Sequence, residues 1–107
     1  MLDVHNISRG TTHTLTLTLP PEYDLTNCES LYLTFAQNDK ELFSLTKDDV
    51  DINLNVIIAK LSQERTLEFN TGRAEMQLRA KLNNGDVITQ QPPTKLCIGK
   101  IYKDGVI

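Results

Sequence analysis

The sequence predicts an all-β protein, an antiparallel β-sandwich of about seven short strands, with a small, partly open barrel as the alternative. Apolar and polar residues alternate with a period of two in several segments, and turn-forming residues separate these segments at regular spacing. No segment has the spacing of a long amphipathic helix. The chain has 107 residues, which suits one hydrophobic core. We therefore expect residues 1–107 to form a single β-sandwich domain.

The first predicted strand covers residues 11–19. Its leucines share one face and its threonines the other: Leu15, Leu17 and Leu19 against Thr14, Thr16 and Thr18. Threonine is β-branched and tolerates water, so we expect the threonine face to be exposed. Pro20-Pro21 ends the strand because proline cannot donate to a ladder.

The next two strands, over residues 30–37 and 41–46, are predicted to pair as a hairpin across the polar turn at 38–40. Residues 47–49 then form a charged turn, with Thr46 as a candidate cap. A strand at 54–61 is apolar on both faces, which predicts that both faces are covered. Ser62 suits the N-cap of one short helical turn.

The clearest pattern lies between Arg73 and Ile88. Apolar residues at Ala74, Met76, Leu78, Ala80 and Leu82 alternate with charged or amide residues, and the alternation stops at Asn83-Asn84-Gly85-Asp86 before Val87-Ile88. An Asn-Gly pair tolerates the positive φ angles of a tight primed turn, so this segment predicts a β-hairpin. The last strand is predicted over residues 95–102.

Composition and charge exclude several classes of partner. The formal net charge is -3, which gives no basic field for nucleic acid. No apolar run approaches the roughly 20 residues of a membrane helix, and residues 1–6 lack the basic and apolar order of a signal peptide. We therefore expect synthesis and folding in the cytoplasm. Cys28 and Cys97 are then expected to be reduced, mostly buried thiols.

The sequence offers no constellation of reactive groups. His5 and His13 are the only histidines and match no ligand spacing, and the glycines form no phosphate-binding motif. The acidic cluster at residues 48–51 lacks the glycine and glutamate that a calcium loop requires. We therefore predict no catalytic, cofactor-binding or metal-binding residue, no cofactor, and no enzymatic activity.

Surfaces for other proteins remain. There is no Trp, and Tyr23, Tyr32 and Tyr102 are dispersed, whereas sugar-binding domains present clustered aromatic platforms. Convergence of the three tyrosines on one concave surface would favour a carbohydrate-binding module. Otherwise the strand edges and the threonine face are the surfaces available for docking.

Most of the chain consists of segments that together carry a resemblance to a known group: residues 14–20, 23–26, 31–35, 57–64, Thr66, Phe69, Gly72, 74–80 and 99–107. In the order of these segments the chain resembles small virion-associated proteins of phages and prophages of Gram-positive bacteria. It is also similar, more loosely, to the immunoglobulin-like N-terminal domain of phage baseplate upper proteins, in which an Asp-Leu-Thr corner precedes a strand. The resemblance covers most of the chain and implies an immunoglobulin-like sandwich, but it carries over no functional residue.

The resemblance implies a non-enzymatic structural or accessory protein of a phage tail or baseplate. Such a protein would dock to other virion proteins or to copies of itself, with no nucleic acid and no membrane insertion, and would move from the bacterial cytoplasm into the virion. The alternatives are a host-wall carbohydrate-binding or receptor-binding module and a small inhibitor of a host protein. The predicted interface residues are Thr14, Thr16 and Thr18, or the tail residues Val106 and Ile107.

Overall fold

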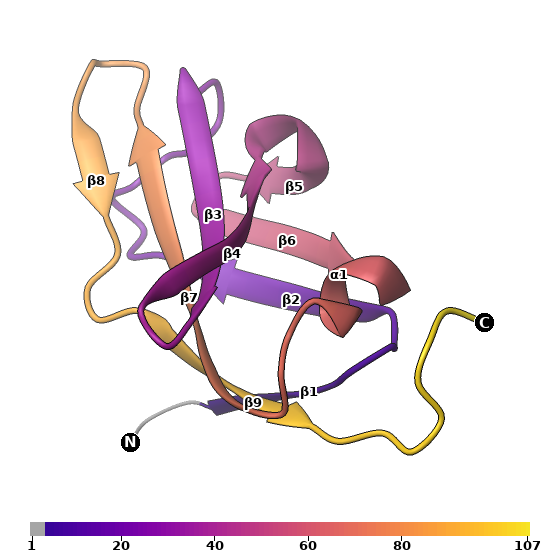
Figure 1. Ribbon diagram of the computed structural model, residues 1–107. Helices are drawn as coiled ribbons and strands as arrows, with labels where there is room; N and C mark the ends of the chain where they lie inside the picture. The colour runs from indigo at the N-terminus through magenta and orange to yellow at the C-terminus, as the bar shows by residue number, and fades with distance from the viewer. Residues whose placement is uncertain (1–3) are drawn as a thin grey trace.

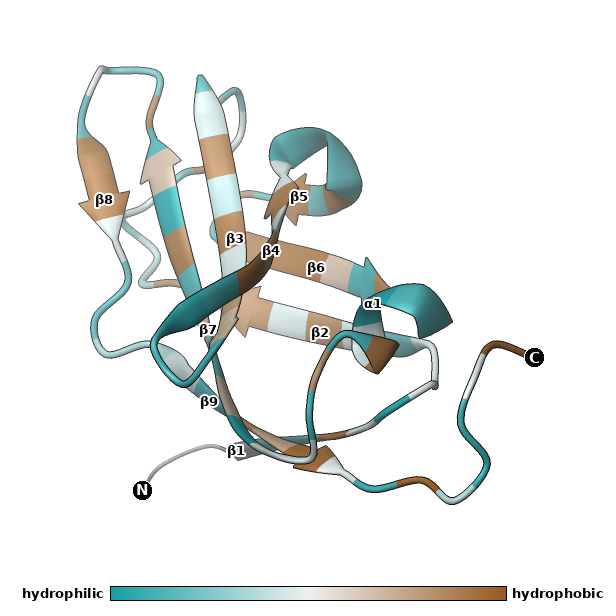
Figure 2. Cartoon of the chain, in the orientation of Figure 1, coloured by the Kyte–Doolittle hydropathy of each residue, from teal (hydrophilic) through white to brown (hydrophobic). Residues whose placement is uncertain are grey.

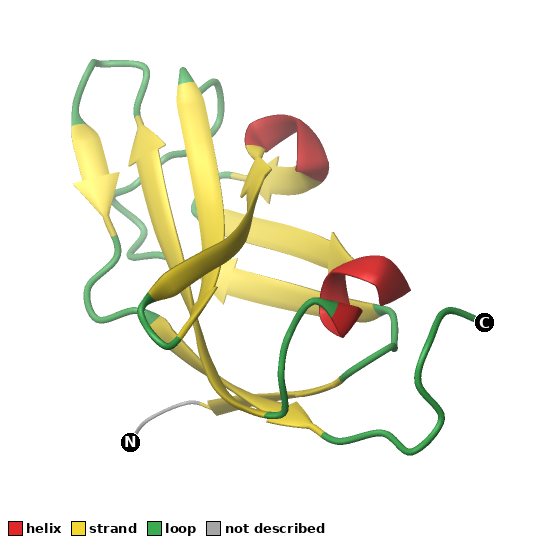
Figure 3. Ribbon diagram, viewed as in Figure 1, coloured by secondary structure: helices red, strands yellow, loops and turns green. Residues whose placement is uncertain are grey.

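A computed structural model describes residues 4–107 and shows two packed β-sheets with two short helical segments (Figures 1 and 3). Nine strands lie within this range: β1 (Val4–Ser8), β2 (His13–Thr18), β3 (Ser30–Gln37), β4 (Lys40–Thr46), β5 (Val50–Asn53), β6 (Val56–Leu61), β7 (Gly72–Lys81), β8 (Val87–Thr89) and β9 (Thr94–Gly99). The helical segments are the 3₁₀ turn η1 (Lys47–Asp49) and the helix α1 (Gln63–Leu67).

The larger sheet has the strand order β1-β9-β7-β3-β4, with β8 paired to the far end of β7. The smaller sheet has the order β2-β6-β5, and β2 and β6 lie across the direction of β3 and β7 (Figure 1). The described strands thus form two separate sheets, which confirms the sandwich over the partly open barrel. All strand pairs are antiparallel except β1 and β9, which are parallel.

The core lies between the sheets and is supplied by alternate residues, as the period of two predicts. In β7 the alternation places Ala74, Met76, Leu78 and Ala80 in the core. The same banding is visible along β2 and β3 in Figure 2. The fully buried large side chains come from both sheets and from the connecting segments: Ile7, Leu25, Leu31, Leu33, Phe35, Ile57, Leu61, Phe69, Met76, Leu78, Leu96 and Ile98.

Both predicted hairpins form, but the primed turn lies in the other one. Between β7 and β8, Leu82 N–H donates to the Asp86 carbonyl at 2.8 Å, which leaves a three-residue loop in which only Gly85 has a positive φ, 94°. This geometry is typical of a bulged three-residue hairpin rather than a two-residue primed turn. Between β3 and β4, Asn38 and Asp39 both have positive φ, 52° and 62°, as a type I′ turn requires.

Three further expectations about the strands need correction. The strands β1 and β5 were not predicted, because five-residue and four-residue segments rich in polar residues resemble turns. The strand β6 is not covered on both faces, since Ile58 is 39% exposed on the outer face. The last strand ends at Gly99 rather than at residue 102.

The predicted helical turn forms at α1 and ties the small sheet to the rest of the chain. Ser62 Oγ accepts a hydrogen bond from Arg65 N–H at 3.2 Å, which satisfies one of the free amides of the first turn. The hydroxyl of Thr66, which is fully buried, donates to the Thr11 carbonyl at 2.8 Å. The helix therefore fixes the start of β2.

Candidate interaction surface

The three predicted threonines lie in one row on the outer face of β2. Thr14, Thr16 and Thr18 are exposed, whereas Leu15 between them is buried in the core. Their cross-strand neighbours on β6 are Lys60, Ile58 and Val56, in that order. The outer face of the small sheet is thus uncharged along β2 and contains one exposed isoleucine beside Thr16.

The strand β2 is also an edge strand. Among the described residues it pairs only with β6, and the register between them runs without interruption. Beyond the strand end, Leu19 N–H donates to the Asn55 carbonyl at 2.8 Å, so Leu19 turns its backbone toward β6. Because antiparallel residues alternate in this respect, the backbone groups of Thr14, Thr16 and Thr18 point away from β6, toward the free edge.

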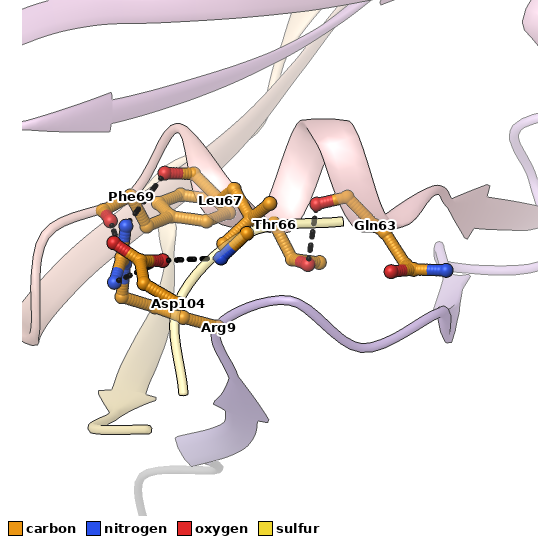
Figure 4. Close-up of polar contacts among 7 residues, drawn as sticks. Arg9, Gln63, Thr66, Leu67, Phe69 and Asp104 are labelled. Atoms are coloured by element: carbon orange, nitrogen blue, oxygen red, sulfur yellow. Dashed lines mark hydrogen bonds and ion pairs between the residues drawn. The ribbon is translucent and has the colours of Figure 1, made fainter. Parts of the chain in front are cut away.

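The predicted tail residues Val106 and Ile107 belong to a segment that polar contacts hold against the domain at two points. Figure 4 shows the first of them, between Arg9 and Asp104. The Arg9 guanidinium donates to the carbonyls of Phe69 at 2.7 Å and Leu67 at 3.1 Å, and forms an ion pair of 3.3 Å with Asp104. Farther along, the Gln63 side chain donates to the Ile107 carbonyl at 3.2 Å and accepts from Ile107 N–H at 2.9 Å. The backbone of the tail is therefore anchored at two points.

The side chains of the anchored tail face solvent. Tyr102 is 96% exposed, Val106 56% and Ile107 97%. The apolar end of the chain stands apart from the sheets in Figure 2. These three side chains are among the large apolar groups that the described residues leave exposed.

The tail is bound just beyond the end of β6, the strand that pairs with the threonine row. Gln63, which binds Ile107, is three residues from Lys60, which pairs with Thr14. The sequence did not indicate Arg9, Gln63 or Asp104 as anchors, because each is separated from its partner by tens of residues. The one local feature that could have pointed to Arg9 as an anchor is its position just before the turn at Gly10, and this feature is weak.

The two cysteines differ in environment. Cys28 is buried, as expected, but Cys97 is exposed, because it lies on the outer face of β9 between the inward residues Leu96 and Ile98. Both thiols are free. The expectation that both would be mostly buried is therefore wrong for Cys97.

A groove of about 610 Å³ opens beside Cys97 on the large sheet. Its lining comes from the β3–β4 turn, β7 and β9: Ala36, Gln37, Asn38, Asp39, Arg73, Ala74, Glu75, Lys95, Leu96 and Cys97. Positive and negative side chains are mixed in this lining, and no aromatic ring is present. The groove therefore has no aromatic platform for a sugar, and the carboxylates of Asp39 and Glu75 offset the cations of Arg73 and Lys95 that could attract an anion.

The tyrosines are spread over different parts of the fold. Tyr32 projects from the outer face of β3, Tyr102 lies in the tail beside Lys100, and Tyr23 lies in the connection between β2 and β3. The small hollow around Tyr32 includes neither of the other two rings. This arrangement provides no aromatic platform for the carbohydrate alternative.

In the acidic segment around η1, the Asp49 carboxylate binds back to Thr46, the residue that precedes the 3₁₀ turn. Asp49 accepts hydrogen bonds from the Thr46 backbone N–H at 2.9 Å and from the Thr46 hydroxyl at 3.1 Å, and these bonds lower the pKa of Asp49 below its ordinary value. Between residues 4 and 107 no group of three or more His, Cys, Asp or Glu side chains is placed to hold a metal.

The cap gives the turn a defined pH dependence. Because the folded state holds Asp49 as the carboxylate, its contribution to stability is present above the ordinary pKa and is lost as pH falls through the lowered one. Replacing Thr46 by valine removes one donor, so we expect the pKa of Asp49 to rise toward its ordinary value in an NMR pH titration. Asp24, whose pKa is lowered by hydrogen bonds from Thr26, serves as the internal control. An unchanged Asp49 titration in Thr46→Val would contradict the role of the hydroxyl.

The comparisons with known proteins support the fold but give no family. No family model matches the chain, and no curated protein matches it. Among solved structures, the chain is similar to the fibronectin(III)-like modules of CbhA from Clostridium thermocellum, with 16% identity, a TM-score of 0.51, and coverage of 96% of this chain and 92% of that one. It also aligns with the ZIG-8-RIG-5 IG1-IG1 heterodimer at 14% identity and a TM-score of 0.45, over 92% and 82% of the two chains.

The order β4-β3-β7-β9 facing β2-β6-β5 matches the two sheets of an immunoglobulin-like domain. No helix in the described range is long and apolar enough to cross a membrane. The chain has an immunoglobulin-like β-sandwich fold.

Proposed function

We propose that this chain is a non-enzymatic structural or accessory protein of a phage or prophage tail or baseplate, and that it acts by docking to other virion subunits. The sequence resemblance supports the virion assignment. The fold class supports docking without catalysis. We also propose that residues 1–107 act as one domain.

The anchored tail is the observation that carries the docking proposal. Tyr102, Val106 and Ile107 expose apolar side chains, while Arg9 and Gln63 hold the backbone in place. A segment that is already ordered loses less conformational entropy when a partner covers it. The tail is thus a preorganised apolar contact for a neighbouring subunit.

Mass spectrometry of purified particles tests the virion assignment directly. Prophages of the source bacterium would be induced, and the particles separated from the lysate on a density gradient. We expect peptides of this chain to co-sediment with the major tail proteins and to be found in the cytoplasm before lysis. Their absence from particles that contain all other tail subunits would overturn the assignment.

The tail itself is tested with the double variant Val106→Ser, Ile107→Ser. We expect at least about a tenfold loss of affinity for isolated phage tails, since truncation of a central apolar contact costs about 2 kcal/mol and about 1.4 kcal/mol already corresponds to tenfold. The free energy of unfolding should change by less than about 0.5 kcal/mol, because both side chains are exposed.

The matched control is Val87→Ser on β8, which removes a valine that is 54% exposed at a distant position. This variant should bind isolated phage tails with the same affinity as the natural chain. An equal loss of affinity in both variants would contradict a specific role of Val106 and Ile107. Binding of the natural chain to host cell walls or to a host enzyme, without binding to tails, would favour one of the two alternative functions.

A further inference from the structure

The free edge of β2 lacks the devices that protect the edges of β4 and β5. The strand β4 begins with the charged pair Lys40-Glu41, and its pairing with β3 contains a register shift. The strand β5 carries Asp51 and follows the acidic turn η1. The strand β2 contains no Asp, Glu, Lys, Arg or Pro. Charges, prolines and bulges prevent edge-to-edge pairing in natural sheets, so β2 is open to pairing.

The topology explains why this edge is free. In immunoglobulin domains of the constant type, the sheet that corresponds to β2-β6-β5 has a fourth strand, the first strand of the chain, beside the strand equivalent to β2. Here the strand that precedes β2 is β1, which pairs with β9 in the other sheet. The small sheet therefore has one strand fewer at the edge of β2.

We propose that a second copy of this chain occupies the missing position, with β2 of each copy pairing antiparallel across a twofold axis at Thr16. The axis sets Thr16 opposite Thr16 of the partner subunit, and Thr14 opposite the partner's Thr18. The outward backbone groups of the three threonines then bond to the same groups of the other copy. The two small sheets become one sheet of six strands.

The sequence of β2 is self-complementary in this register. In an antiparallel pair, opposite residues lie on the same face, so threonines meet threonines outside and leucines meet leucines on the core side. The row through the axis contains Asp51, Ile58 and Thr16, followed by the same residues of the partner in reverse order. No like charges face each other across the pair, and the two half-exposed isoleucines flank it symmetrically.

The interface is small, so the dimer should be weak. One strand pair buries less than the roughly 1,000 Å² expected of a stable interface, and association should depend on protein concentration. The inference does not depend on the tail or on the virion assignment. It names one partner, a second copy, that the proposed function leaves open.

Sedimentation equilibrium of the full chain tests the proposal. We expect a reversible monomer–dimer equilibrium with a Kd of about 1 mM or below. At a protomer concentration equal to the Kd, about half of the protomers are in dimers. Thr16→Lys and Thr16→Glu place like charges opposite each other at the axis, so each variant alone should be monomeric. An equimolar mixture of the two should form a heterodimer, because the opposed charges are then complementary.

Two controls separate this interface from others. Asn53→Lys adds the same charge to the outer face of the same sheet, at its opposite edge, and should leave the dimer intact. The double variant Val106→Ser, Ile107→Ser should also remain dimeric, whatever its effect on binding to phage tails. The proposal is overturned if the natural chain is monomeric at all concentrations, if Asn53→Lys dissociates the dimer equally, or if the Lys and Glu variants fold by circular dichroism but do not associate when mixed.

Discussion

Phe69→Ala is expected to lower the free energy of unfolding by about 3–5 kcal/mol. Phe69 is completely buried, and its ring meets those of Phe35 and Phe43 edge-on, with centroids 6.0 and 5.7 Å apart. Phe35 and Phe43 stack on each other at 4.7 Å. Loss of the Phe69 ring removes two aromatic contacts and leaves a cavity between the sheet and the segment that follows α1.

Chemical denaturation followed by circular dichroism measures this effect. Tyr102→Ala is the matched control, because it removes an aromatic ring that is almost fully exposed and should change stability by less than about 0.5 kcal/mol. A loss below about 1 kcal/mol for Phe69→Ala would mean that the three rings do not form the packed cluster described here.

Gln37→Leu is expected to destabilise the fold by about 1–3 kcal/mol, although it places an apolar side chain at a buried position. The Gln37 amide donates to the carbonyls of Asn70 at 2.8 Å and Arg73 at 3.1 Å, and accepts from Asn70 N–H at 2.7 Å. Leucine fills similar space but leaves these backbone groups without their partners. The segment that leads into β7 would then lose its attachment to the end of β3.

Gln77→Leu provides the comparison. Gln77 is half-buried and donates to one carbonyl, that of Gln90, at 3.0 Å, where water can replace it. We expect a smaller loss of stability than in Gln37→Leu, and local amide exchange should increase at residues 70–73 only in the Gln37 variant. Equal effects of the two substitutions would contradict a special role of the buried amide.

The sequence predicted those elements whose faces differ strongly in polarity. In β2, β3 and β7 the leucines stand at alternate positions on one face, and a register slip by one residue would expose them, so local pattern and tertiary structure agree. The short strand β5 carries the same signal, because Val50 and Ile52 alternate with the exposed residues Asp51 and Asn53. The neighbouring acidic residues concealed it.

The partners of the strands could not be predicted. The parallel pairing of β1 with β9 joins residues about ninety positions apart, and nothing in residues 4–8 specifies a parallel neighbour. The sequence predicted the exposed threonine row on β2, but it did not predict the free backbone edge beside this row. The row depends on a local period of two, but the edge depends on where β1 is placed.

The parallel pairing of β1 and β9 also has a mechanical consequence. A force that draws Val4 and Gly99 apart acts along the axes of these two strands, because β1 begins at one end of the pair and β9 ends at the other. The bonds of the ladder are then loaded together in shear, instead of being opened one after another as in a hairpin. The domain should therefore need a larger force to unfold when it is pulled along this direction than the force that separates β8 from β7 one hydrogen bond at a time.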